Sequence, residues 1–245
     1  MEVIPFSDLP NRFVTTHSEY VLGYLQALGC RAVVIEEPYI DKGYLIDYCQ
    51  FHARSFDAPS RFVTRFHFFA REFDSAYLHR LLEDGADGEI LSFSDDYLGF
   101  AVVKPLLNEA GEPLLGRTVL KTYPAQDGAD SRRFLATGHS PSLCGIPLSV
   151  QSLPYQTQDI AVGACASAAL WVSLYPLCAL FQTPILSLSE ITERAMTAGS
   201  ESRTFPSLGL TLAEMMGVIH GLGLDPEVLS IDPGMADWPV VQAAT

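Results

Sequence analysis

Cys165 is the residue of this 245-residue chain whose type and place best suit chemistry. Small residues surround it, and helical propensity is good from Ala164 onward because alanine and leucine lose little conformational freedom in a helix. In the first turn of a helix, the free N–H groups and the positive end of the dipole favour a thiolate, the nucleophilic form of cysteine. The pattern therefore predicts a nucleophile at the N-terminus of a helix.

The segment that positions Cys165 has no charged residue between Asp159 and Glu190. A helix that is apolar all round is buried, either in a protein core or in lipid. Pro176, the serines and the absence of flanking lysine or arginine argue against a membrane span. We therefore expect a buried helix from Cys165 to about Phe181, bent or interrupted near Pro176 because proline has no N–H to donate.

The stretch PYQTQDIAVGACASAALW resembles the papain-like cysteine peptidases, and most closely the bacterial branch that includes the bacteriocin-processing (C39-type) peptidases. The resemblance covers residues 155–231. It implies that Cys165 attacks a carbonyl carbon and that a glutamine about six residues earlier helps to bind the oxyanion. Here Gln158 lies seven residues before Cys165, and Gln156 lies nine before it. Gln158 and the Cys165 N–H are therefore the expected oxyanion donors.

A cysteine hydrolase also needs a base that takes the thiol proton and a third group that orients the base. In the resembled family these residues follow the cysteine, on the β half of the domain. His220 is the only histidine after Cys165, and it lies within an expected helix, where packing or exposure is the simpler role. We expect the base on a segment beyond Thr245 or on a partner chain, and no peptidase activity from this chain alone.

Two alternatives stay open. A cysteine in an Ala-rich helix is commonly an inert, small apolar residue, and the chain would then be a non-catalytic binding or scaffold module with a degenerate papain-like fold. His139 and Cys144 share a second loop and could form a Cys–His pair, although no neighbouring acid would orient that histidine.

Composition narrows the function further. The net charge of −14 and a pI near 4.7 oppose binding to nucleic acid or to anionic membranes. Five cysteines without regular spacing, and an N-terminus without signal-peptide features, predict reduced thiols and a cytoplasmic protein. No CxxC or HExxH pattern is present, so we expect no metal and no cofactor, and a peptide or protein is the expected substrate.

We predict an α+β fold in two units: a mixed α+β unit over residues 1–150, and the helical half of a papain-like domain over residues 151–245. Alternating apolar residues and turn signals predict the strands of the first unit. These strands are expected at 32–36, 62–68, 116–123, 133–137 and 146–150, with a hairpin over 89–104 that turns at 94–96.

Capping residues predict where several helices begin. Asp41 and Asp74 suit N-caps, because a short carboxylate accepts a bond from a free N–H of the first turn. Two Ser/Thr-x-x-Glu capping boxes follow the cysteine helix, at Ser187–Glu190 and at Thr211–Glu214. A strand is expected at 228–231.

Overall fold

The computed structural model describes residues 1–56, 58–123, 135–158, 165–198 and 209–229. The fold is α+β, as predicted, and combines an antiparallel sheet with helices between and after its strands. The helices are η1 (Phe6–Asn11), α1 (Ser18–Ala27), α2 (Lys42–Gln50), η2 (His52–Arg54), α3 (Ser75–Asp84), α4 (Asp87–Asp95), α5 (Cys165–Phe181), α6 (Leu188–Ala198) and α7 (Leu212–Gly221), where η marks a 3-10 helix.

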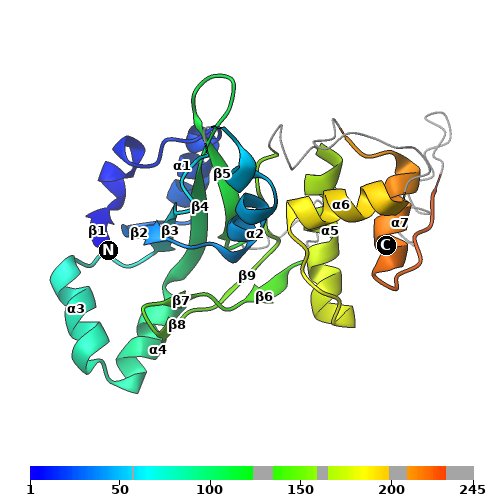
Figure 1. Cartoon of the computed structure of the whole chain (residues 1–245). Helices are drawn as coiled ribbons and strands as arrows, with labels where there is room; N and C mark the ends of the chain where they lie inside the picture. Colours follow the sequence, from blue (N-terminus) through cyan, green and yellow to red (C-terminus); the bar gives the residue numbers. More distant parts are fainter. Residues whose placement is uncertain (57, 124–134, 159–164, 199–208, 230–245) are drawn as a thin grey trace, which may run out of the picture.

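The main sheet has five strands in sequence order, each antiparallel to the next. Its strands are β1 (Glu2–Pro5), β2 (Ala32–Tyr39), β3 (Val63–Phe69), β4 (Tyr97–Leu107) and β5 (Pro113–Leu120). Two further pairs are small, β6 (Thr137–His139) with β9 (Val150–Ser152), and β7 (Ser142–Leu143) with β8 (Ile146–Pro147). Figure 1 shows β6 and β9 running between the main sheet and the group formed by α5, α6 and α7.

One face of the sheet packs against η1 and α1. Leu9 of η1 and Leu25 of α1 are buried there with Phe66 and Phe68 of β3. Phe13, which follows η1, meets the Phe66 ring edge-on at 5.1 Å between ring centroids, an arrangement that aromatic rings favour. The alternating aromatic residues of β3 therefore form a core, as their spacing predicted.

The opposite face of the sheet is also covered, by α2, α3, α4 and the small strands. Phe69 and Phe100 pack here with Phe93 of α4. Because successive side chains of a strand point to opposite faces, the polar residues that alternate with the first core enter this second one. Arg65 and His67 of β3 are accordingly buried.

Helices α5, α6 and α7 share a third core, which includes Trp171, Ile191 and Val218. A buried polar contact joins this group to the sheet: the Asp47 Oδ1 of α2 accepts bonds from the Ser189 N–H at 3.0 Å and from the Ser189 hydroxyl at 2.6 Å. Burial raises the pKa of Asp47 against the opposing effects of Lys104 and Ser189. A carboxyl group at the first turn of α6 also complements the helix dipole.

The predicted caps are confirmed. Asp41 Oδ1 accepts from the Tyr44 N–H at 3.1 Å, and Asp74 Oδ1 accepts from the Tyr77 N–H at 2.8 Å. Both predicted capping boxes have their two reciprocal bonds, Ser187 with Glu190 before α6 and Thr211 with Glu214 before α7.

The hairpin predicted over residues 89–104 is wrong in its first strand, because residues 87–95 form α4. Ile90 and Phe93, three residues apart, lie on one side of this helix and pack into the second core. Glu89 in the first turn of α4 forms an ion pair with Arg80 of α3 at 2.8 Å. Packing and charge pairing with α3 thus favour a helix here over a strand.

The strands predicted over 32–36, 62–68 and 116–123 are found as β2, β3 and β5. The prediction over 146–150 is wrong as one strand, because residues 148–149 separate β8 from β9, and the prediction over 133–137 is wrong for residues 135–136, since β6 begins only at Thr137. Residues 133–134 of the predicted 133–137 strand and residues 230–231 of the predicted 228–231 strand lie outside the described residues, and residues 228–229 are not in a strand. Beyond β9, Tyr155 pairs with Thr118 of β5, and the Thr157 N–H bonds the Leu115 carbonyl at 2.8 Å. The division into units at residue 150 stays a prediction.

The bounds predicted for the cysteine helix, Cys165 to Phe181, are those of α5. The helix is not buried all round, however: Leu170, Trp171 and Leu174 face the third core, while Ala169 and Ser173 are exposed. Small and hydroxyl side chains on the exposed side explain how an uncharged helix tolerates water. Within the described residues, no helix combines the length and apolarity needed to cross a bilayer.

Candidate functional site

Cys165 is the first residue of α5, and its side chain is exposed. Cys49 and Cys144 are also exposed, whereas Cys30 and Cys178 are buried. Burial raises the pKa of Cys30 to about 12, and burial together with nearby Glu36 raises the pKa of Cys144. The predicted turn that contains Gly163, just before α5, lies outside the described residues.

The two glutamines before Cys165 differ in their surroundings. Gln156 is buried, and its Oε1 accepts from the Lys104 ammonium at 3.5 Å, so its side chain is engaged with β4. Gln158 is exposed and follows Thr157, the last residue bonded to the edge of β5. Gln158 is therefore the more exposed of the two glutamines. No hydrogen bond between Gln158 and Cys165 occurs among the residues that the structure describes.

His220 lies in the last turn of α7, with about half of its side chain exposed. Its Nδ1 lies 3.9 Å from the Asp225 carboxylate, which is itself exposed. A histidine at a helix C-terminus interacts favourably with the dipole when protonated, so this position suits a surface role, as expected from the sequence.

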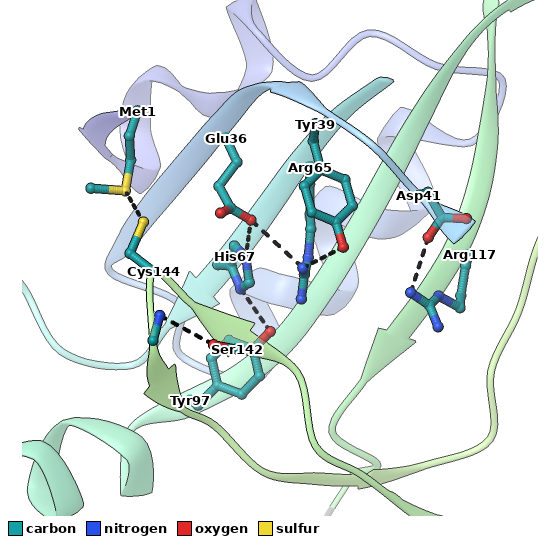
Figure 2. Close-up of polar contacts among 11 residues, drawn as sticks. Met1, Glu36, Tyr39, Asp41, Arg65, His67, Tyr97, Arg117, Ser142 and Cys144 are labelled. Atoms are coloured by element: carbon teal, nitrogen blue, oxygen red, sulfur yellow. Dashed lines mark hydrogen bonds and ion pairs between the residues drawn. The ribbon is translucent and has the colours of Figure 1, made fainter. Parts of the chain in front are cut away.

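The possible Cys–His pair of the second loop is not formed. His139 Nε2 lies 3.3 Å from the Ser152 carbonyl oxygen and 3.2 Å from the Thr137 hydroxyl. Cys144, by contrast, lies at the turn after β7, where its sulfur contacts Met1 Sδ at 3.5 Å (Figure 2). The two side chains serve different contacts.

A row of polar side chains that the sequence did not predict crosses the second face of the sheet. This polar row contains Arg117, Arg65 and His67. Arg65 of β3 and Arg117 of β5 lie on either side of Phe100 of β4, with their guanidinium carbons 4.6 Å and 5.3 Å from its ring centroid. The Arg65 Nη1 donates to the Tyr39 hydroxyl at 2.8 Å, and Arg117 Nη2 pairs with Asp41 at 2.9 Å (Figure 2). Arginine stacked on an aromatic face is held in a fixed plane.

The row continues through a buried network around His67. His67 Nε2 lies 2.8 Å from the Glu36 carboxylate, and His67 Nδ1 lies 2.9 Å from the Tyr97 hydroxyl (Figure 2). Burial lowers the pKa of His67 to about 4, although Glu36 opposes the change. Burial alone would raise the pKa of Glu36, but His67 and Arg65 outweigh it and lower that pKa.

Arg65 and Arg117 open onto a cleft of about 580 Å³ between the sheet and α5. On the α5 side Tyr175, Cys178 and Ala179 line it, and segment 137–142 closes another side. Burial disfavours the charged form of Arg117, but Asp41 and the Tyr175 hydroxyl outweigh it and raise the pKa of the guanidinium. The arginine therefore stays charged at the wall of the cleft.

One local signal could have singled out Arg65. It lies inside a strand directly before Phe66, and a buried arginine is rare unless it is paired. Nothing in the local sequence connects it with Arg117, because that pairing depends on the order of the strands. Among the described residues, no group of three His, Cys, Asp or Glu side chains is arranged to hold a metal ion.

Comparison of the chain with protein-family models, with curated proteins and with solved structures found no match.

Proposed function

We propose that this chain carries the nucleophile of a papain-like cysteine peptidase or of a related thiol acyl-transfer enzyme. The observation that carries the proposal is the place of Cys165, an exposed thiol at the first residue of α5. Backbone N–H groups of a first helical turn stabilise a thiolate. The resemblance of the surrounding sequence to the papain-like family supports the same role.

In the proposed reaction, the Cys165 thiolate attacks the carbonyl carbon of a peptide or ester, and the carbonyl electrons move to oxygen. The Cys165 N–H and the exposed Gln158 amide would bind this oxyanion. Collapse of the intermediate expels the amine or alcohol, which takes a proton from a general acid, and leaves a thioester. Water or a second acceptor then releases the acyl group and restores the thiol.

The proposal needs a general base, and His220 is not our candidate. Its side chain lies on the surface of α7 beside Asp225. We propose that the base comes from a further segment or from a partner chain. Alkylation of Cys165 then does not require the base, whereas turnover of a substrate does. Cys165 is expected to react with an alkylating agent even where this chain alone shows no turnover.

Alkylation by iodoacetamide, followed by peptide mass spectrometry, tests the nucleophile. Cys49 is the matched control, because it is also exposed and helical but lies in the last turn of α2, where the dipole opposes a thiolate. At neutral pH we expect Cys165 to react about fivefold or more faster than Cys49. Cys30, which is buried in the core on the first face of the sheet, should stay unlabelled in the folded protein.

Equal labelling of Cys165 and Cys49 across the pH range would reject the nucleophile. The second candidate, a non-catalytic binding module, would then be favoured. Its own support is the apolar surface at the end of α5, where Leu180, Phe181 and Ile185 are 65%, 61% and 56% exposed. A protein partner is the expected ligand of such a surface.

A further inference from the structure

We infer that the cleft between the sheet and α5 is a binding site for a small molecule that carries a carboxylate or phosphate group. The inference does not depend on Cys165, which is not among the residues that line the cleft. The cleft volume of about 580 Å³ lies in the range of small-molecule sites in proteins.

Arg65 and Arg117 supply hydrogen-bond donors to the cleft. A guanidinium has five N–H donors. The Tyr39 bond and the 3.7 Å ion pair with Glu36 both use Arg65 Nη1, and the Asp41 bond uses Arg117 Nη2. The Nε atoms of both arginines are buried and have no acceptor in the described part of the chain. Arg65 also bonds the Tyr97 hydroxyl and Arg117 the Tyr175 hydroxyl. Because the Nε atoms are shielded from solvent, the donors left for an oxyanion in the cleft are the remaining Nη hydrogens of the two guanidinium groups.

The charged side chains that line the cleft are arginines. The chain has a net charge of −14, yet among the described residues that line the cleft none carries a carboxylate, while two are arginines. Glu36 is shared, because it also accepts from His67 at 2.8 Å, and it neutralises Arg65 only in part. Asp41 likewise pairs with Arg117 at 2.9 Å, so what the cleft offers an anion is the remaining guanidinium N–H donors without a carboxylate at the cleft surface.

The remaining side chains of the cleft lining offer hydroxyl groups and apolar contacts to a ligand. Hydroxyl groups can bind the remaining oxygens of the ligand, and the Thr183 hydroxyl is buried without a hydrogen-bond partner in the described residues. Pro141 and Ile185 offer apolar contact on other sides. Burial lowers the pKa of His139, so this imidazole adds no charge to the cleft at neutral pH, and its Nε2 hydrogen is directed to the Ser152 carbonyl oxygen 3.3 Å away. The lining hydroxyls belong to Tyr39, Thr137, Ser140, Ser142, Tyr175 and Thr183.

Calorimetric titration of the chain tests the site with three probes at matched ionic strength: phenyl phosphate, benzoate and the neutral benzamide. We expect saturable binding of at least one anion and none of benzamide. Binding of phenyl phosphate alone assigns the site to phosphate compounds, and binding of benzoate alone assigns it to carboxylates. Absence of saturable binding by both anions, or equal binding of benzamide, would overturn the inference.

Two pairs of variants locate the binding. Arg117→Gln should weaken the anion about tenfold or more, because it removes a charged donor, whereas Arg12→Gln is the control. Arg12 also pairs with a carboxylate, Glu2, but at the surface and outside the cleft. Equal affinity of Arg117→Gln and the unaltered chain would place the anion elsewhere.

The second pair keeps the inference testable if Arg117→Gln fails to fold. Ala179 is exposed on α5 and lines the cleft, so Ala179→Phe should block the anion without disturbing a core. Ala169 is exposed on the same helix and does not line the cleft, so Ala169→Phe should leave affinity unchanged. Equal binding by both phenylalanine variants would contradict the assigned cleft.

Discussion

At the scale of single residues, His67 shows how burial selects a protonation state. The Glu36 carboxylate can only accept, so the His67 Nε2 must carry the hydrogen of their 2.8 Å bond. The Nδ1 atom then accepts from the Tyr97 hydroxyl, whose pKa burial raises. His67 is 0% exposed and both its nitrogens are engaged, so it holds the polar row together and is closed to a substrate.

We predict a pH dependence of stability from the same residue. Burial lowers the pKa of His67 from 6.5 to about 4 in the folded chain. As the pH falls from 6.5 towards 4, the unfolded chain binds a proton at His67 and the folded chain does not, so the free energy of unfolding decreases. The contribution is about 3 kcal/mol at most.

Denaturant unfolding at a series of pH values measures this effect. His67→Gln should be less stable at neutral pH, because it disturbs a buried network, but its stability should fall less on acidification. His79 is exposed on α3, and His79→Gln should keep the pH profile of the unaltered chain. Parallel pH profiles for His67→Gln and the unaltered chain would show that His67 is not the titrating group.

At the scale of elements, β4 depends on a glycine at its closest approach to β5. Gly99 pairs with Leu120 and has φ +124°, a conformation that other residues rarely adopt. A Cβ atom at this position would overlap the Val119 carbonyl oxygen and the Leu120 Cα. Neither neighbour can move easily, because both belong to the backbone of the adjacent strand.

Gly99→Ala is therefore expected to lower the free energy of unfolding by about 2 kcal/mol or more. Gly23 of α1 is the control, since an added Cβ there meets nothing within 4 Å. Gly23→Ala should raise stability by about 0.5–1 kcal/mol, because alanine loses less backbone entropy in a helix. Thermal unfolding of both variants compares them, and a neutral Gly99→Ala would contradict the close approach of β4 and β5.

At the scale of the whole molecule, the described residues form three cores, and a buried polar contact connects the second with the third. The two faces of the sheet carry one core each, and α5, α6 and α7 enclose the third. Asp47 of α2 links the second to the third through its bonds to Ser189, and only 3% of it is exposed. A buried bond of this kind is costly to break, because the Ser189 N–H in the first turn of α6 loses its acceptor.

We expect Asp47→Ala to lower the free energy of unfolding by about 3 kcal/mol and to increase hydrogen exchange of the first α6 amides. Asp47→Asn should retain most of the stability, since its amide oxygen can accept both bonds and burial already disfavours the charge. Asp74→Ala, which removes an N-cap within α3 alone, should cost about 1 kcal/mol and leave α6 exchange unchanged. Unaltered hydrogen exchange of the α6 amides in Asp47→Ala would show that the bonds from Asp47 to Ser189 do not stabilise the contact between the second and third cores.

The sequence by itself determined the features that depend on neighbours along the chain. The bounds of α5, the Asp41 and Asp74 caps, the capping boxes before α6 and α7, and the position of β3 follow from propensity, capping chemistry and period-two alternation. These features were predictable because the interacting groups lie within a few residues of one another. The place of Cys165 at a helix start belongs to this class.

Tertiary structure decided what depends on partners distant in sequence. Residues 87–95 form α4, in which Phe93 packs into the second core and Glu89 forms an ion pair with Arg80. Alternation in β3 gave no sign that its polar side would be covered, and burial of Arg65 follows from the elements packed on that face. Strand order brings Arg65 and Arg117 to opposite sides of Phe100, and the packing of α5 and segment 137–142 beside them forms the cleft. Local spacing carries no information on strand order, which is decided by burial of both faces of the sheet at once.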